Sequence, residues 1–456
     1  MERQPNIRHW RVRCTLVVAA FAMMLDAAPA AAIDLLRSYE LALTNDGQLK
    51  VARARASQGR ELLPQAEAQL WPNLSFSYAY GQTDETRSLN GLSASQRYPS
   101  RSGTVQARQP IYHGILLAQL DEARSKVQGV EAQVEADYQT TGIRVINAYL
   151  EALFARDSLA LIGAQKASYA AQLRAARLAL NAGTGTRTDI DDIQARYDLL
   201  LADEIRTRQA IEASAQQLEI FIGEPVKSLA GLDAEVFHAE DFDTAALDKW
   251  IDAAMESNPE VRTLKARYDA AVAAINGAQA GHYPTLDLIA QYRDSTGDST
   301  NTLPRTDTRV GYVGLQLTVP IFAGGYVNSQ VRQATAAADE AREAYEYARY
   351  DLRLKVKREF DGLKGGISRL NALDVALKSG NQMVLSNEKG VRAGTRTTLD
   401  VLAAEQQRFN TRVELAKSRY QILLSWATLL SYGGELKSEQ VARINRVLRE
   451  SAPTAM

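Results

Sequence analysis

Four segments of the chain alternate apolar and polar side chains with the two-residue period of a β-strand. In residues 73–82, large apolar side chains fall on one face and small or polar ones on the other. Residues 103–110, 285–293 and 311–320 repeat the alternation less regularly. We expect the apolar face to contact membrane hydrocarbon through Leu74, Phe76, Tyr78, Tyr80, Leu286, Leu288, Tyr292, Val313, Leu315, Leu317 and Val319. A small soluble sheet beside a helical domain is the alternative.

A polar stretch separates the two strands of each pair, at residues 83–102 and 294–308. Both stretches are rich in Ser, Asn, Asp, Gly, Thr and Arg. Transmembrane barrels combine strands of about 9–11 residues with longer external loops. We therefore expect both stretches to form long loops.

The windows that follow each strand pair contain no proline, at residues 111–224 and 321–452. Proline breaks helix interiors, and both windows are rich in strong helix formers such as Ala, Leu, Glu and Arg. The sequence predicts one helix from Gly114 to about Asn181, which at 1.5 Å per residue is roughly 100 Å long. The apolar positions recur every three to five residues, a spacing that an ordinary helical bundle or coiled coil also has.

An internal repeat with a period near 211 residues relates the two strand pairs. Three landmarks recur in the same order: Trp71-Pro72 as Tyr283-Pro284, Pro110-Ile111 as Pro320-Ile321, and Ala182-Gly183-Thr184 as Ala393-Gly394-Thr395. Ordered correspondences of this kind indicate a duplicated structural unit. We expect a first repeat at residues 33–234, a second at 235–446 and a C-terminal tail at 447–456. Each repeat is predicted to hold a helix, two strands and long helices.

The first 32 residues have the composition of a secretory signal peptide. Arginines precede a short apolar run from Cys14 to Leu25, and small residues at 28–32 offer a cleavage site. A transmembrane anchor is the alternative, but the run is shorter than the ~20 residues that span a bilayer. Removal of the signal also removes Cys14, the single cysteine, so we expect no disulfide within the chain.

Charge and residue chemistry argue against several classes of protein. The formal net charge of −1 provides no basic field for nucleic acid. Outside the signal, His113, His238 and His282 do not stand at metal-ligand spacing, so no metal is expected. No Ser/His/Asp set or pair of catalytic carboxylates stands out. We therefore expect neither an enzyme nor a cofactor.

The number of strands constrains how this chain could cross a membrane. The smallest transmembrane barrels use about eight strands, so four cannot close one. An open sheet edge in lipid leaves backbone groups unpaired, at several kcal/mol each. If the strands span a membrane, several copies of the chain must share one barrel.

Two segments of the second repeat, VPIFAGGYVNSQV at 319–331 and AGTRTTLDVL at 393–402, resemble the TolC family of outer-membrane channels. The resemblance extends over residues 33–446. It implies an α+β membrane protein in which a homotrimer shares a 12-stranded transmembrane β-barrel, with four strands from each chain. The long helices would continue as an α-helical barrel across the periplasm of a Gram-negative bacterium.

The same resemblance implies a gate at the periplasmic end. By position, Arg396 is similar to the family's gating arginine, and Thr188 and Asp189 match its partners. Asp400 matches an acidic residue that lines the closed aperture. Two positions, Val391 and Ala403, depart from the family pattern, which has a tyrosine and a second aspartate there.

The function implied is the exit duct of a tripartite export system, with type I protein secretion as the main interpretation. Its partners would be a periplasmic adaptor, an inner-membrane ABC transporter and outer-membrane lipid. The outer-membrane component of a multidrug efflux pump, driven by protons, is the nearest alternative. A soluble periplasmic coiled-coil scaffold or adaptor is an alternative of another class.

Overall fold

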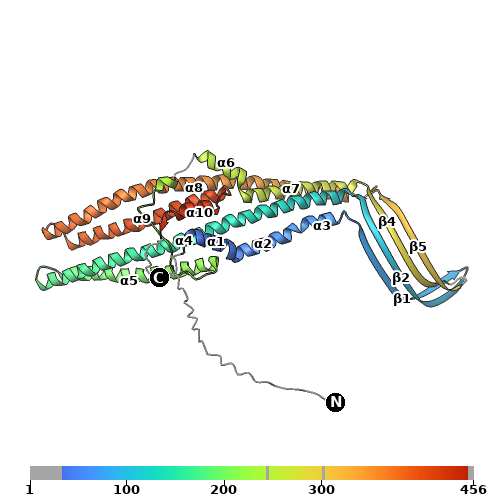
Figure 1. Cartoon of the computed structure of the whole chain (residues 1–456), viewed down its shortest axis with the longest axis horizontal. Helices are drawn as coiled ribbons and strands as arrows, with labels where there is room; N and C mark the ends of the chain where they lie inside the picture. Colours follow the sequence, from blue (N-terminus) through green and yellow to red (C-terminus); the bar gives the residue numbers. More distant parts are fainter. Residues whose placement is uncertain (1–32, 243–245, 300–302, 450–456) are drawn as a thin grey trace, which may run out of the picture.

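The computed structural model describes residues 33–242, 246–299 and 303–449. The molecule is elongated, with a sheet of long strands at one end and two helical hairpins at the other (Figure 1). The predicted signal peptide and residues 450–456 of the predicted tail lie outside the described residues.

Two very long helices set the length of the molecule. Helix α4 covers Gly114–Asn181 and α8 covers Tyr326–Arg392, with 68 and 67 residues. The prediction of one helix from Gly114 to Asn181 is confirmed. Each helix ends in a turn and returns as a shorter one, α5 at Arg187–Ile222 and α9 at Thr398–Tyr432. Both turns begin with a left-handed glycine, Gly183 at φ 74° and Gly394 at φ 71°, the conformation that ends many helices.

Shorter helices precede each strand pair. In the first half these are α1 (Leu35–Asn45), α2 (Gly47–Arg60) and α3 (Leu62–Ala68). In the second half they are α6 (Leu247–Ser257), α7 (Pro259–Gln279) and the 3-10 turn η2 (Ala280–His282). Around the middle lie η1 (Ala239–Phe242), α10 (Ser438–Asn445) and a small pairing of β3 (Gly231–Leu232) with β6 (Leu448–Arg449).

The main sheet contains four antiparallel strands in the order β1-β2-β4-β5. The strands are β1 (Asn73–Leu89), β2 (Leu92–Tyr112), β4 (Thr285–Ser299) and β5 (Leu303–Thr318). All four predicted strands are present, and each is longer than predicted on the side away from the helices. Val319 lies one residue beyond β5.

The prediction of a long loop at residues 83–102 is wrong. Strands β1 and β2 pair without interruption as far as Leu89 and Leu92, and only Asn90 and Gly91 form the turn, with φ 51° and 83°. Asn-Gly is a strong signal for a two-residue hairpin turn, and the sequence carried it. The apolar alternation stops after Tyr80 because both faces are polar there, while the backbone pairing continues.

Most of the predicted loop at 294–308 is also strand, since β4 continues to Ser299 and β5 begins at Leu303. Residues 300–302 lie outside the description. In long hairpins the backbone groups are satisfied by pairing between the strands and not by side chains. Polar composition alone therefore did not distinguish strand from loop.

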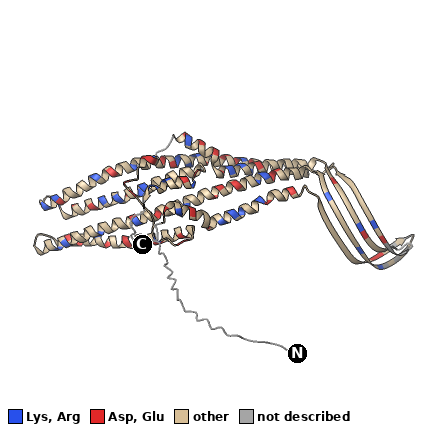
Figure 2. Ribbon diagram, in the orientation of Figure 1, with Lys and Arg blue, Asp and Glu red and all other residues tan. Residues whose placement is uncertain are grey.

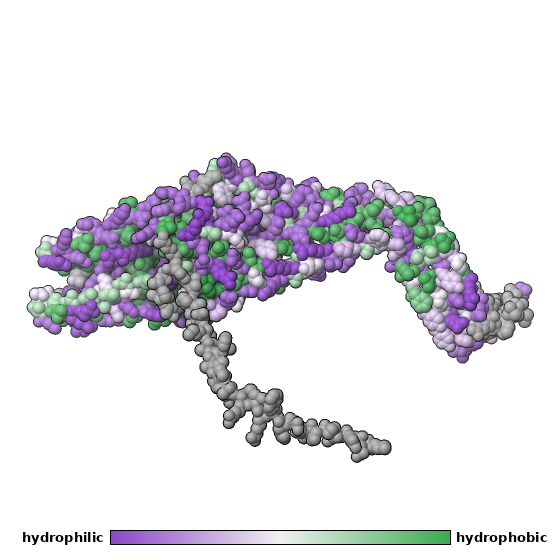
Figure 3. Space-filling model, viewed as in Figure 1, coloured by the Kyte–Doolittle hydropathy of each residue, from purple (hydrophilic) through white to green (hydrophobic). Residues whose placement is uncertain are grey.

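The register of the sheet collects the predicted apolar residues on one face. Leu74 pairs with Ala107, Ala107 with Ala290, and Ala290 with Val313, in one row across the sheet. Ten of the eleven predicted side chains are exposed in the single chain, and Leu286 is half-buried. Apolar residues gather on the sheet beside the helices, and polar residues follow farther out (Figure 3).

The helices nearest the sheet form a layer in the same order as the strands. Helix α4 contacts α2 and α3 on one side and α7 on the other, and α7 also contacts α8. Helix α3 leads into β1, and β5 leads into α8. The two outer strands of the sheet therefore continue into the helices at the two edges of the layer.

The main hydrophobic core lies at the middle of the molecule, where α1, α4, α5, α9 and α10 meet. Tyr149 is completely buried there, and its hydroxyl lies 3.0 Å from both the Ile33 and the Ala230 carbonyl oxygens. None of the helices in the described part combines the length and apolar character of a membrane-spanning helix. Acidic and basic residues are interspersed along the helices (Figure 2).

Two glycines of α4 provide a matched test of this packing. A Cβ added at Gly142 would lie 2.9 Å from Tyr39 Cε2 and 3.0 Å from Leu436 Cδ2, whereas one added at Gly163 meets nothing within 4 Å. We expect Gly163→Ala to stabilise the helix by up to about 1 kcal/mol, because alanine has the higher helix propensity. We expect Gly142→Ala to lower the free energy of unfolding, because overpacking costs about 1–3 kcal/mol. Thermal unfolding in detergent measures both, and equal shifts would contradict the close packing of α1 on α4.

Candidate functional site

The tips of the two helical hairpins hold the residues predicted to form a gate. Each tip begins its returning helix with a capping box, Thr186 with Asp189 on α5 and Thr397 with Asp400 on α9. The Thr186 hydroxyl donates to Asp189 at 2.6 Å, and the Thr397 hydroxyl donates to Asp400 at 2.9 Å. The backbone N–H of each aspartate donates to the threonine oxygen in return. The backbone N–H of Thr186 donates to Asp189 at 3.2 Å, and that of Thr397 donates to Asp400 at 2.9 Å. Both predicted acids therefore satisfy a backbone donor at the start of their own helix.

The cap holds the Asp400 carboxylate in its charged form. Hydrogen bonds from the Thr397 backbone and hydroxyl lower the pKa of Asp400, and the nearby Arg396 charge lowers it further. Because this folded-state pKa lies below the ordinary value, the contribution of the cap is complete above that ordinary value. It is lost only as the pH falls through the lowered pKa. Asp400 therefore stays negative across neutral and mildly acidic pH.

Arg396 is exposed at the tip of the α8–α9 hairpin. Its backbone N–H donates to the Gly390 oxygen at 3.2 Å. Among the described residues of one chain, Arg396 makes no hydrogen bond or ion pair with Thr188 or Asp189, because these two residues lie on the other hairpin. The departures from the family pattern lie at the same end, with Val391 half-buried in α8 and Ala403 exposed on α9.

The two hairpins of one chain meet between α4 and α9 along a seam that the sequence did not reveal, where polar links lie beside Leu402, which is buried among apolar residues of α4 and α5. The Ser168 hydroxyl donates to Glu405 at 3.0 Å, and the Tyr169 hydroxyl donates to Gln406 at 3.2 Å. Nearer the middle, Tyr420 donates to Asp157. These residues are more than 230 positions apart, so no local spacing could have paired them.

One acid of this seam, Asp157, is half-buried, and the other, Glu405, is almost fully buried. Burial raises the pKa of Asp157, although the hydrogen bond from Tyr420 and the charges of Arg156 and Arg419 oppose the rise. The Glu405 side chain is almost fully buried, and its Oε2 has no hydrogen-bond partner among the described residues. Unsatisfied buried polar atoms weaken an interface.

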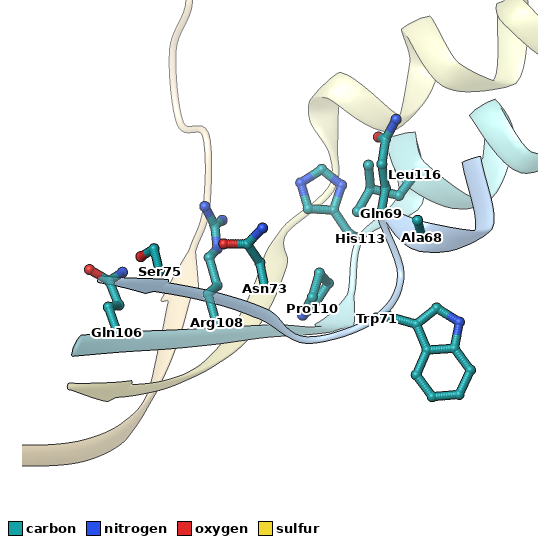
Figure 4. A pocket seen from close by; sticks show the side chains of 10 residues that line it. All are labelled: Ala68, Gln69, Trp71, Asn73, Ser75, Gln106, Arg108, Pro110, His113 and Leu116. Carbon is teal, nitrogen blue, oxygen red and sulfur yellow. The ribbon is translucent and has the colours of Figure 1, made fainter. Parts of the chain in front are cut away.

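The polar face of the sheet carries a charge pair in which the acid is buried and the arginine is exposed. Arg108 on β2 donates from Nη2 to Asp287 Oδ2 on β4 at 2.6 Å, and the Asp287 side chain is only 2% exposed. Beside this pair, where the strands meet the helices, lies a cavity of about 680 Å³. Figure 4 shows Ala68, Gln69, His113 and Leu116 grouped at the helix ends, with the Trp71 indole directed away from them.

No group of His, Cys, Asp and Glu in the described residues is arranged to hold a metal ion. His113 lies at the start of α4, His238 beside η1 and His282 in η2. The three histidines therefore lie on separate elements. The polar residues described above are arranged along long surfaces rather than around one enclosed site.

The chain matches the outer membrane efflux protein family over residues 38–224 and 250–435. It is 28% identical to the proteases secretion protein PrtF of Dickeya chrysanthemi, over 95% of each chain. It is 30% identical to the alkaline protease secretion protein AprF of Pseudomonas aeruginosa, over 92% of this chain and 88% of AprF. The fold is similar to the crystal structure of the outer membrane protein VceC from Vibrio cholerae, with a TM-score of 0.76, 18% identity, and coverage of 88% and 97% of the two chains.

Removal of one capping hydroxyl tests the tip geometry. We expect Thr397→Ala to speed amide hydrogen exchange in the first turn of α9 about fivefold, because an N-cap contributes roughly 1 kcal/mol. Thr186→Ala is the matched variant and acts on the first turn of α5. Each variant should leave the other tip unchanged in exchange measured by mass spectrometry. If either variant speeds exchange equally at both tips relative to the wild type, the two caps are not independent.

Proposed function

The chain belongs to the outer membrane efflux protein family, and from that premise we propose that it is the outer-membrane exit duct of a type I protein secretion system. The names of PrtF and AprF, which both refer to protease secretion, support this branch of the family. The duct would act with a periplasmic adaptor and an inner-membrane ABC transporter. We assign it transport and no chemical step.

The observation that carries the proposal is the pair of free edges. Among the described residues of one chain, β1 pairs only with β2, and β5 pairs only with β4. Unpaired backbone groups at a strand edge cost several kcal/mol each in hydrocarbon, so the sheet is complete only when another chain pairs with it. Three copies in a ring provide 12 strands, the number that the family resemblance implies, and extend the helical layer around the same axis.

The exposed apolar band argues against a soluble scaffold. Leu74, Phe76, Tyr80 and Val313 are each at least 70% exposed in the single chain and lie on one face of the sheet. A contiguous apolar face of this kind marks a membrane or a protein interface. Outer-membrane lipid is the partner proposed for it.

We place the gate between copies. Arg396 of one copy would bind Thr188 and Asp189 of the next, and Asp400 would line the aperture. Asp189 retains acceptor capacity beyond its capping bonds, and the arginine fork is suited to carboxylates. An exposed pair of this kind contributes only about 0–1 kcal/mol, so a docking partner could break it.

Drug efflux is the second candidate, because the family description names efflux. The same duct serves either cargo, and the inner-membrane pump makes the difference. Deletion of the gene separates the two functions. Loss of a secreted protease from the medium with unchanged drug sensitivity supports type I secretion, whereas the reverse result supports efflux.

The architecture is tested by extraction of the outer membrane with detergent and mass measurement of the particle. We expect a particle of three chains from the outer-membrane fraction. A single-chain particle that needs no detergent would contradict the duct.

The gate assignment has its own test in planar bilayers. We expect Arg396→Ser to raise single-channel conductance, because it removes the link between neighbouring tips. Arg392→Ser is the matched control, since Arg392 is also exposed and lies in the last turn of α8. Unchanged conductance in Arg396→Ser, or an equal rise in both variants, would remove the assignment.

A further inference from the structure

Because the two halves of the chain are repeats, the contact between them within one chain is a template for the contact between neighbouring chains. The strands of the two halves superimpose in register: Asn73 pairs with Arg108 in the first pair, and Thr285 pairs with Thr318 in the second. Residues of β1 therefore correspond to residues of β4 212 positions later, and residues of β2 to residues of β5 210 positions later. Helices α4 and α8 correspond with an offset of 211, as their tips at Ala182 and Ala393 do.

Within the chain, the end of the first half packs on the start of the second. Strand β2 pairs with β4 in a register that places Ala107 opposite Ala290. At the junction with the helices, Gly114 approaches the segment that enters β4. A Cβ added at Gly114 would lie 3.0 Å from Ala280 Cβ and 3.5 Å from Tyr283 Cδ2.

The equivalent surfaces at the other edges of the chain are open. Gly325 corresponds to Gly114, and a Cβ added at Gly325 or at its neighbour Gly324 meets nothing within 4 Å. Ala68 and Trp71 correspond to Ala280 and Tyr283, and they border the cavity of about 680 Å³, which Ser75 of β1 and Arg108 of β2 also line (Figure 4).

Exposed apolar side chains are present on both of these surfaces. Trp71 is 70% exposed on one side, and Ile321 and Phe322, in the segment between β5 and α8, are 94% and 89% exposed on the other. Both surfaces lie at the level where the strands meet the helices. Copies related by rotation about the axis of a ring keep the same height along that axis. One of these surfaces on each copy therefore comes against the other surface on the neighbouring copy.

We propose that the segment 319–325 of one copy packs against Ala68 and Trp71 of the next, and that β5 pairs with the next β1 with Leu317 opposite Tyr78. The register follows from the template, because Ala107 corresponds to Leu317 and Ala290 to Tyr78. Both side chains lie on the apolar face, so the alternation of the sheet continues across the boundary. This inference rests on the proposed ring of copies and specifies how it closes.

A cysteine pair tests the register in native outer membranes. The double variant Tyr78→Cys, Leu317→Cys is made with Cys14→Ala, which leaves no other cysteine. Directly opposite residues in antiparallel strands have Cα atoms about 4.5–5.5 Å apart, within the usual range for a disulfide. In one chain the two positions lie on the outer strands, separated across the sheet by three strand spacings, or about 14 Å at ~4.8 Å per strand. Tyr78 is level with Arg309 on β5, so Leu317 also lies eight residues farther along that strand, and the two positions cannot link internally. We expect oxidation to produce covalent trimers on a non-reducing gel.

The matched control shifts the register by two residues. In Tyr80→Cys, Leu317→Cys the diagonal positions are about 7–8 Å apart, and we expect little linkage. If the shifted pair links better, or if neither pair links in a particle with the mass of three chains, the proposed register is wrong while the duct stands. If neither pair links and the particle has the mass of one chain, the proposed ring fails and this inference fails with it.

A second variant tests the junction between the strands and the helices. Ala68 is exposed in the single chain, so Ala68→Trp should leave the fold intact and obstruct the incoming segment. We expect the trimer to dissociate at a lower temperature in detergent. Glu67→Trp, at the neighbouring exposed position, is the control. Equal dissociation temperatures for the wild type and Ala68→Trp would overturn this contact.

Discussion

Backbone hydrogen bonding at the two outer strands is the constraint on which this structure depends. In the part of the chain that the structure describes, strands β1 and β5 each have one edge without a partner strand, next to a face of exposed apolar side chains. Hydrocarbon provides no donors or acceptors, so such edges must pair with protein. A sheet of four strands cannot curl far enough to pair with itself. Association with further copies is therefore a condition of the membrane part of this fold.

The helical layer is arranged by the same constraint. Each strand at the junction leads into or out of a helix, so the helices take the order of the strands. Small residues let these helices approach closely. A Cβ added at Gly129, for example, would lie 3.3 Å from Ala266 Cβ. The duplicated sequence repeats this arrangement, and its two halves meet inside the chain in the way we infer that neighbouring chains meet.

The periplasmic end follows different physics. The acids at the tips cap their own helices, which orients them and keeps Asp400 charged. The hairpins meet between α4 and α9 through polar links beside the buried Leu402. Exposed ion pairs and partly satisfied polar contacts are weak, whereas the apolar core around Tyr149 is well packed. The molecule therefore combines a well-packed apolar middle with tips held by polar capping contacts, where we propose that the gate lies.

Local features were readable from the sequence because their causes are local. The absence of proline predicted the span of α4, the alternation from Leu74 to Tyr80 predicted the apolar face, and the glycine turns marked the tips. The full length of the hairpins was not predicted, because polar residues beyond Tyr80 carry no alternation and pairing with a neighbouring strand decides their structure. The Tyr420–Asp157 link and the Arg108–Asp287 pair depend on helices and strands distant in the chain, so only tertiary packing could bring them together. Sequence alone thus determined the elements and their apolar faces, whereas the tertiary structure decided which edges stay open, because an edge is defined only by what lies beside it.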